Sequence, residues 1–265
     1  MPLVSAVAAG NVVLLKPAHE TPEISRMTQK IVAEVFPPEH VSVVLGEGAT
    51  LGEILLEHFE FDHIFFTGSH RVGRWIMEKA AKYLSRVTLE LGGKSPSIID
   101  DRFDLDKAAR KIIWGKVINA GQTCVSTDYV LVPKQRVAEF TEACKRQILS
   151  LLGDKPFTSN EYCHIINEQR FDRLVSLLNG CDILYGGSHQ KSIRCIEPTL
   201  VAVTDLDLPI MQEEIFGPIL PIVAYDNKEH LLTIIRKNRY PLSLYLFVED
   251  KKLNQFILDR VEFGS

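Results

Sequence analysis

The sequence predicts an α/β protein of two lobes. Short apolar runs alternate with helical patterns from residue 11 to residue 91, and the alternation restarts after an interruption at Gly92-Gly93. Alternation of this kind is typical of a parallel sheet with crossover helices. The length of 265 residues accommodates one large domain or two modest ones. We therefore expect an incomplete, Rossmann-like cofactor domain at residues 1–91 and a cysteine-bearing α/β catalytic domain at residues 92–265.

The first lobe opens with a short apolar strand at residues 12–15. Thr21 is then a suitable N-cap, and Pro22 suits the first position of a helix. The apolar residues that recur on one face of this helix are Ile24, Met27, Ile31 and Val35. A stripe of this kind is typical of a helix that packs against a core.

The remaining elements of both lobes follow from the same two periodicities. Further strands of the first lobe are expected at residues 41–45, 63–66 and 87–91, with helices at 50–58 and from Val72 to Leu84. In the second lobe Asp104 should cap a helix that runs to Val117. The other expected elements there are strands at 97–99, 129–132, near Ile183 and near Leu200, helices at 135–152 and 169–178, and a strand-helix-strand-helix series over 219–258.

Composition excludes several classes of protein. Lysine and arginine number 30 against 34 aspartates and glutamates, so the net charge of −4 provides no basic field for nucleic acid. The five cysteines are odd in number and include no C-x-x-C pair, a pattern that suits neither a metal site nor a disulfide framework. We expect a reduced, cytoplasmic protein.

Targeting and membrane segments are also disfavoured. Residues 1–15 are apolar, but no Lys or Arg precedes them and Gly10-Asn11 breaks the run, so a secretory signal is a poor interpretation. The sequence contains no run of ~18 apolar residues that would span a bilayer.

One candidate site is the turn Phe66-Thr67-Gly68-Ser69-His70-Arg71-Val72-Gly73, which joins a predicted strand to a predicted helix. Glycines there let the backbone approach an anion, and the amides and dipole of a helix N-terminus favour negative charge. The turn is therefore a candidate pyrophosphate site. An ordinary tight turn explains the same residues equally well.

Three further residues could carry chemistry. Cys124 follows the small-residue stretch Asn119-Ala120-Gly121 and could be a nucleophile, although a lone cysteine is more often a small buried apolar residue. We give the other four cysteines that structural interpretation. Glu90 stands between leucines, where burial would raise its pKa towards that of a general base, unless it simply faces outwards. The stretch Glu213-Glu214-Ile215-Phe216-Gly217-Pro218 joins a carboxylate to an aromatic residue on a rigid turn and could clasp a sugar and a ring, although the hexapeptide alone indicates little.

Taken together, the ordered stretches LLKPA, FFTGS with VG, LELGGKSP, GQTC and EEIFGP resemble the aldehyde dehydrogenase superfamily. The resemblance runs from about Pro2 to the last residues and is closest to the class 3 branch, which acts on fatty and aromatic aldehydes. The details that favour this branch are Asp128-Tyr129, Ile165-Ile166-Asn167, Phe171-Asp172-Arg173 and the stretch from Met211 to Val223.

The resemblance implies NAD(P)-dependent oxidation of aldehydes to carboxylic acids. Cys124 would form a thiohemiacetal and then a thioester, and Glu90 would activate the water that releases the acid. The resemblance also implies the cofactor contacts. Lys16 would bind the adenosine ribose, and Gly68 and Ser69 would bind the pyrophosphate, with His70, Arg71, Val72 and Gly73 in the same turn. Glu214 would bind the nicotinamide ribose, Phe216 would pack against the nicotinamide, and Thr67 and Leu91 would line the nicotinamide site.

Departures from the family pattern qualify this expectation. His19 replaces an acidic residue that would repel a 2′-phosphate, and His70 and Arg71 add positive charge, so we expect NADP to be accepted as well as NAD.

A P-W-N-like segment that supplies an oxyanion donor would lie before Pro2, and a C-terminal dimerisation arm after Ser265. The chain is therefore expected to be truncated at both ends and weak or inactive alone, with the homodimer of the full-length family uncertain. The alternatives are a non-catalytic remnant that binds nucleotide or a full-length partner, and a thiol esterase that uses Cys124 and Glu90.

Overall fold

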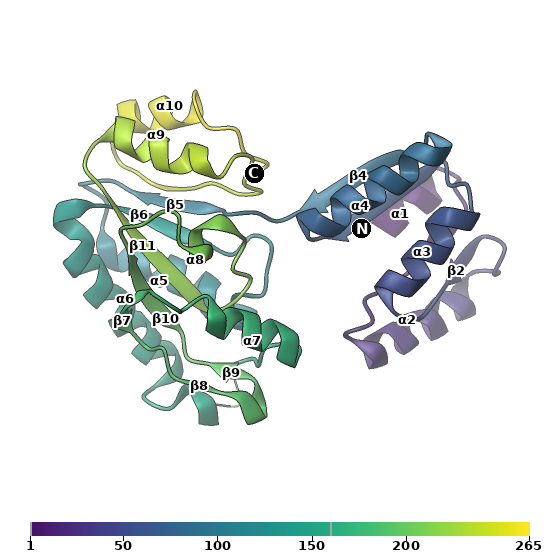
Figure 1. Cartoon of the computed structure of the whole chain (residues 1–265), viewed down its shortest axis with the longest axis horizontal. Helices are drawn as coiled ribbons and strands as arrows, with labels where there is room; N and C mark the ends of the chain where they lie inside the picture. The colour runs from purple at the N-terminus through teal and green to yellow at the C-terminus, as the bar shows by residue number, and fades with distance from the viewer. Residues whose placement is uncertain (1, 160) are drawn as a thin grey trace. The chain divides into compact units, whose positions relative to one another are not determined.

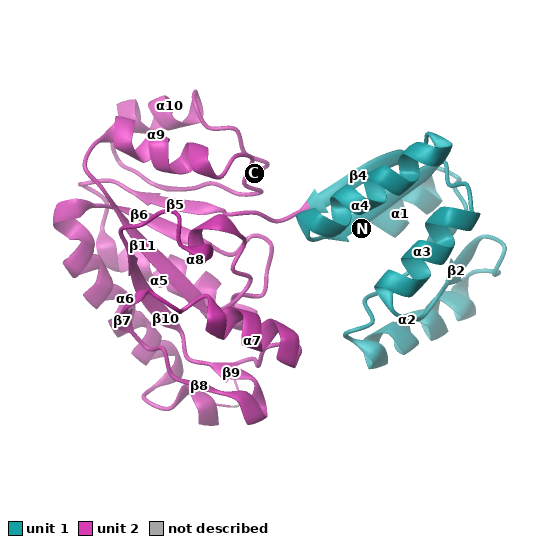
Figure 2. Cartoon of the chain, viewed as in Figure 1, with its two compact units in different colours: residues 1–90 teal, residues 91–265 magenta. Residues whose placement is uncertain are grey.

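The computed structural model describes residues 2–159 and 161–265, and the chain divides into two compact units, Met1–Glu90 and Leu91–Ser265 (Figure 2). Each unit is described by itself. The division falls beside the interruption that the sequence shows at Gly92-Gly93. Helices alternate with strands in both units, so the expected α/β class is confirmed.

The first unit contains two pairs of hydrogen-bonded strands. Strand β1 is parallel to β2, and β3 pairs with β4. Its elements are α1 (Pro2–Ala8), β1 (Val13–Leu15), α2 (Pro22–Val35), β2 (Val41–Val43), α3 (Gly48–His58), β3 (His63–Gly68), α4 (His70–Ala80) and β4 (Arg86–Leu91).

The apolar stripe predicted to pack against a core on α2 is instead exposed. Ile24, Met27, Ile31 and Val35 are each more than half exposed, while the buried residues of this helix are Ser25 and Val32. Periodicity identifies the apolar face of a helix but does not say what covers it. The helix expected from Val72 to Leu84 also ends early, because α4 stops at Ala80 and Leu84 is 90% exposed.

The second unit is built on a six-stranded sheet in the order β12-β5-β6-β11-β10-β7. Figure 1 labels β5, β6, β11, β10 and β7 of this sheet. Its strands are parallel except for β7, which runs antiparallel to β10 at one edge. The strands are β5 (Pro96–Ile99), β6 (Tyr129–Pro133), β7 (Asp182–Tyr185), β10 (Thr199–Val203), β11 (Ile219–Tyr225) and β12 (Tyr245–Phe247), with a small antiparallel pair β8 (His189–Gln190) and β9 (Cys195–Ile196).

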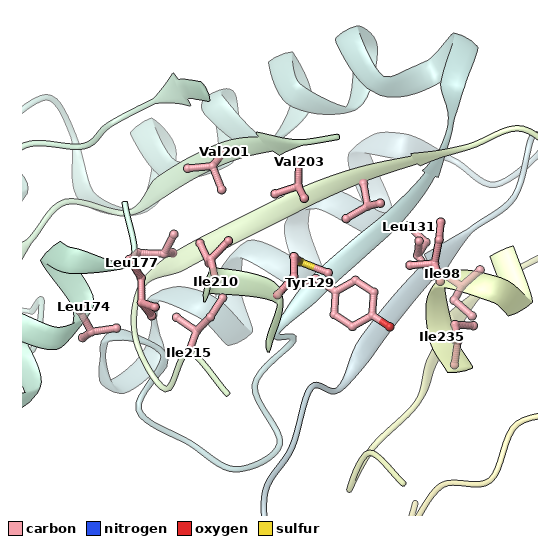
Figure 3. Packing of buried hydrophobic residues seen from close by; sticks show 14 of the residues in the cluster. Ile98, Tyr129, Leu131, Leu174, Leu177, Val201, Val203, Ile210, Ile215 and Ile235 are labelled. Atoms are coloured by element: carbon pink, nitrogen blue, oxygen red, sulfur yellow. The ribbon is translucent and has the colours of Figure 1, made fainter. Parts of the chain in front are cut away.

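Side-chain alternation along these strands produces two separate cores. Ile98 and Leu131 belong to one buried cluster, shown in Figure 3, while Ile99 and Val130 belong to the other. Successive residues of a strand point to opposite faces, so a sheet with both faces covered has continuous apolar strands. The covering helices are α5 (Leu105–Val117), α6 (Val137–Leu152), α7 (Glu168–Ser176), α8 (Pro209–Gln212), α9 (Lys228–Lys237) and α10 (Lys251–Leu258).

Two aspartates connect the ends of these elements. Asp104 caps α5 as predicted, because its side chain accepts a hydrogen bond from the Lys107 amide at 3.0 Å. Asp100 is 3% exposed and accepts backbone hydrogen bonds from residues 102 and 103 and from residues 249 and 250. These four amides together hold the pKa of Asp100 below its usual range, although burial acts in the opposite direction. The carboxylate therefore joins the ends of β5 and β12.

Candidate active site

Cys124 lies in the loop between α5 and β6, and it is exposed. The preceding 3-10 turn, Ile118–Gly121, contains three residues in the left-handed region, with φ of 50° at Asn119 and Ala120 and 70° at Gly121. A Cβ on Gly121 would lie 2.3 Å from the carbonyl oxygen of Gly217, so only glycine allows this approach. The loop that bears Cys124 therefore touches the loop around Glu214.

Side-chain hydrogen bonds hold the cysteine loop in place. The Asn119 side-chain amide donates to the Gln122 carbonyl at 2.9 Å. Gln122 in turn donates to the carbonyl of His164 at 3.1 Å and accepts from the amide of Ile166 at 3.0 Å. The segment before Cys124 is thus braced against residues 164–166, while the thiol stays open to solvent.

A buried ion pair lies beneath the same loops. Lys94 is 5% exposed and Asp128 3%, and the Lys94 ammonium donates to the Asp128 carboxylate and to the carbonyls of Ile210 at 2.8 Å and Glu213 at 3.0 Å. The second oxygen of Asp128 accepts from the Ile215 amide at 2.9 Å. The pair therefore connects the segment after β4, the segment before β6 and the loop at residues 213–217.

Glu214 is half-buried against the backbone of Gly92. A Cβ on Gly92 would lie 2.0 Å from Oε1 of Glu214, so a larger residue at position 92 would displace the Glu214 carboxylate. Burial, aided by the charge of Asp128, raises the pKa of Glu214 to about 7, against the opposing influence of the Gly93 amide, Lys94 and Arg173. A carboxyl group in this range changes its charge near neutral pH.

Phe216 and Arg173 complete the loop at residues 213–217. Phe216 has a φ of 53° and is 41% exposed, so its ring is available to a ligand. Arg173, on α7, donates to the carbonyls of Glu214, at 3.2 Å, and Ile215. The structure thus places Glu214 and Phe216 on one loop that is held from two sides.

Lys116 is the remaining buried charge near the cysteine loop. It is 2% exposed and donates to the carbonyl of Thr127 at 2.8 Å, which closes the base of the loop, and burial lowers its pKa to about 8. Sequence reasoning assigned no role to Lys94 or Lys116, and it used Asp128 and Arg173 only as marks of resemblance. A charged residue inside an apolar pattern, such as Lys116 in its helix, is the signal that could have identified them.

The phosphate-turn candidate in the first unit has the expected strand-to-helix form. Strand β3 ends at Gly68, α4 begins at His70, and the Ser69 side chain accepts from the Val72 amide at 3.4 Å. Residues 67–71 are exposed, Val72 is half-buried and Gly73 is buried. The first turn of α4 contains no acidic residue, so nothing there opposes an anion.

The other predicted residues of the first unit lie in the structure as follows. The Lys16 ammonium donates to the Pro17 carbonyl at 2.9 Å, and His19 is exposed and lies 3.3 Å from the carboxylate of Glu20. Glu90 is exposed on β4, while its neighbours Leu89 and Leu91 are half-buried. The Glu90 side chain therefore lies on the face of β4 opposite to those of Leu89 and Leu91, because successive side chains of a strand alternate between its two faces.

The cysteines follow the structural interpretation with one exception. Cys144 and Cys195 are buried, and burial raises the pKa of Cys195 to about 11. Cys163 is exposed, so the expectation that it is a small buried residue is wrong. Across residues 2–159 and 161–265, no three histidine, cysteine or carboxylate side chains come together as a metal site. No helix in that same part of the chain is long and apolar enough to cross a bilayer.

Comparison with known proteins decides the family. Residues 1–265 match the model of the aldehyde dehydrogenase family. The chain belongs to this family. The aldehyde dehydrogenase chain is 40% identical to 4,4′-diaponeurosporen-aldehyde dehydrogenase of Staphylococcus aureus and 41% identical to aldehyde dehydrogenase family 3 member A2 of Rattus norvegicus. It is covered completely in both alignments but spans only 58% and 54% of those relatives, about half of their length.

Solved structures agree with this assignment. The substrate-bound state of Staphylococcus aureus AldH is 39% identical, with a TM-score of 0.94 over 99% of this chain and 57% of that one. The Mycobacterium tuberculosis aldehyde dehydrogenase complexed with NAD⁺ is 33% identical, with a TM-score of 0.86 over 98% of this chain and 56% of that one. The relatives named as family 3 members confirm the class 3 resemblance of this aldehyde dehydrogenase chain.

Proposed function

We propose that the protein formed with this chain oxidises aldehydes to carboxylic acids with NAD or NADP. The observation that carries the proposal is the contact between two loops of the second unit. One loop bears the exposed thiol of Cys124, and the other bears Glu214 and Phe216. A nucleophile and a clasp for a ribose and a ring are thereby brought together on rigid supports.

Cys124 begins the proposed reaction. Its thiolate adds to the aldehyde carbonyl carbon and forms a thiohemiacetal, which loses a hydride and becomes a thioester. Glu90 then takes a proton from water, and the resulting hydroxide attacks the thioester, which breaks the carbon–sulfur bond and releases the carboxylic acid and the Cys124 thiolate. Glu90 passes its proton to solvent and is ready for the next cycle. For this role the exposed carboxylate of Glu90 would need to become desolvated when substrate and cofactor are bound.

The residues present fit a dinucleotide. The exposed turn after β3 offers helix amides, His70 and Arg71 to a pyrophosphate, and Lys16 offers an ammonium to the adenosine ribose. Glu214 offers a carboxylate to the second ribose. The bound cofactor supplies the hydride acceptor. His19 supports acceptance of NADP, although the neighbouring carboxylate of Glu20 offsets part of any positive charge there.

The substrate class and setting belong to the same proposal. Medium-chain aliphatic or aromatic aldehydes are supported by the class 3 resemblance, and by the exposed apolar side chains of Trp114, Ile118 and Val125 that flank Cys124 in the chain. All five cysteines are free, which supports a cytoplasmic location. The resemblance implies a homodimer for the full-length family.

The experiment is a single-turnover assay with protein in excess over aldehyde, so that even a slow chain registers. We expect NAD(P)H to form with either cofactor, to be lost in Cys124→Ala and to persist in the matched variant Cys163→Ala, which removes the other exposed cysteine. Steady-state turnover of the 265-residue chain is expected to stay far below the ~10 s⁻¹ of ordinary enzymes.

Two other outcomes would contradict the proposal. Nucleotide binding without any NAD(P)H would support a non-catalytic remnant, which the exposed apolar stripe on α2 also favours. Hydrolysis of an activated ester that needs Cys124 and no cofactor, without any aldehyde oxidation, would support a thiol esterase.

A further inference from the structure

The Lys94 ammonium has no proton left for a ligand. Its three acceptors are the Asp128 carboxylate and the carbonyls of Ile210 and Glu213, so its role lies within the protein. Asp128 similarly uses one oxygen for Lys94 and the other for the Ile215 amide. The ion pair thus holds residues immediately before and after Glu214, the carboxylate between them.

We propose that the buried Lys94–Asp128 pair is a positioning pair that fixes the loop at residues 213–217 and sets the charge of the Glu214 carboxylate. The inference rests on the proposed function, because it concerns the side chain that we assign to the nicotinamide ribose. Neither member of the pair need touch the substrate or the cofactor.

Opposing charges surround Glu214 and make this control possible. The negative Asp128, before β6, favours the protonated form of Glu214, whereas the positive Lys94, after β4, and Arg173, on α7, favour the ionised form. Lys116, on α5, also interacts electrostatically with Glu214. An ionised carboxylate accepts hydrogen bonds from two ribose hydroxyls, whereas a protonated one loses part of that capacity. Cofactor affinity should therefore follow the charge of Glu214.

The test is a pH titration of the Glu214 carboxyl by carbon-13 NMR, with the signal assigned by its loss in Glu214→Gln. Lys94→Met removes a positive neighbour and should raise the titration midpoint by about one pH unit, while Asp128→Asn should lower it by about one. Both variants break the same ion pair. If the pair served only to hold the loop, both would loosen it, let water reach Glu214 and lower the midpoint.

Midpoints that move in the same direction, or that do not move, would overturn the proposal. The matched controls are Asp106→Asn and Arg146→Met, which break an exposed ion pair of 2.7 Å in the same unit and should leave the midpoint unchanged. If a single variant does not fold, the double variant Lys94→Met/Asp128→Asn replaces it. Its midpoint should stay close to that of the unsubstituted chain, because the two expected shifts are opposite and of similar size. A pair that only held the loop would let water reach Glu214, so a midpoint about one pH unit lower would count against the proposal.

The titration needs no bound nucleotide, so it separates this inference from the proposed function. NAD binding measured over the same pH range should show a midpoint that moves with that of Glu214 in each variant. A chain that binds no nucleotide would refute the proposed function, while the NMR midpoints would still decide whether the pair controls Glu214. Normal NAD binding whose pH dependence is the same in both variants as in the unsubstituted chain would refute only the inference.

Discussion

Lys116→Met is expected to stabilise the second unit at neutral pH and to lose this advantage in alkaline solution. Burial lowers the pKa of Lys116 from 10.5 to about 8, so charging it in the folded state costs about 3 kcal/mol at pH 7. Between the two pKa values the unfolded chain binds more protons, so stability from this group rises with pH and the cost falls to about 1 kcal/mol at pH 9.5.

The net effect also includes a lost hydrogen bond. Methionine leaves the Thr127 carbonyl without the 2.8 Å bond from Lys116, at a cost of about 1 kcal/mol. The variant should therefore be about 2 kcal/mol more stable than the unsubstituted chain at pH 7 and about equal to it at pH 9.5.

Urea unfolding at the two pH values measures this difference. In a Trp75→Phe background Trp114 is the only tryptophan, and it lies on α5 two residues before Lys116, so its fluorescence reports the second unit. Lys111→Met replaces an exposed lysine of the same helix and should show no pH-dependent difference. Equal changes in unfolding free energy at both pH values would show that Lys116 carries no desolvated charge, and a loss of stability at pH 7 would refute the reasoning.

Three further predictions concern other positions of the second unit. Asp100→Asn should destabilise the second unit by about 2 kcal/mol at pH 7. Because the pKa of Asp100 is lowered in the folded state, the difference in urea midpoint between the variant and the unsubstituted chain should shrink as the pH falls below 3.8. Gly121→Ala places a Cβ 2.3 Å from the carbonyl oxygen of Gly217, so the loop that bears Cys124 must shift. The rate at which Cys124 is alkylated, measured by peptide mapping, should therefore change several-fold, and an unchanged rate would contradict the contact between the two loops. Asp104→Ala should cost about 1 kcal/mol, measured by thermal or urea unfolding, through loss of the cap on α5, and Asp104→Asn should retain most of that stability.

Much of this fold follows from local pattern. The helices that begin at Pro22 and after Asp104 and the strands before Gly68 and at Tyr129 lie where periodicity predicts them. Asp104 caps its helix as expected, whereas the Thr21 side chain makes no capping hydrogen bond. Their positions depend on residues within a few places along the chain, which a single sequence displays. The ordered motifs around Cys124 and Glu214 likewise revealed the family, because they combine residue type with spacing.

The tertiary structure alone decided which of these residues meet and which are buried. Lys94 and Asp128 are 34 residues apart, and Asp128 and Ile215 are 87 apart, yet they form one buried network because the strand order sets their segments side by side. The exposure of the apolar stripe on α2 and of Glu90 also depends on which other segments cover each face. The periodicity of a short stretch of sequence does not contain that information. The sequence determines elements and chemistry through short-range sterics and pattern, whereas burial, and with it the charge state of Glu214, depends on contacts that only the folded chain creates.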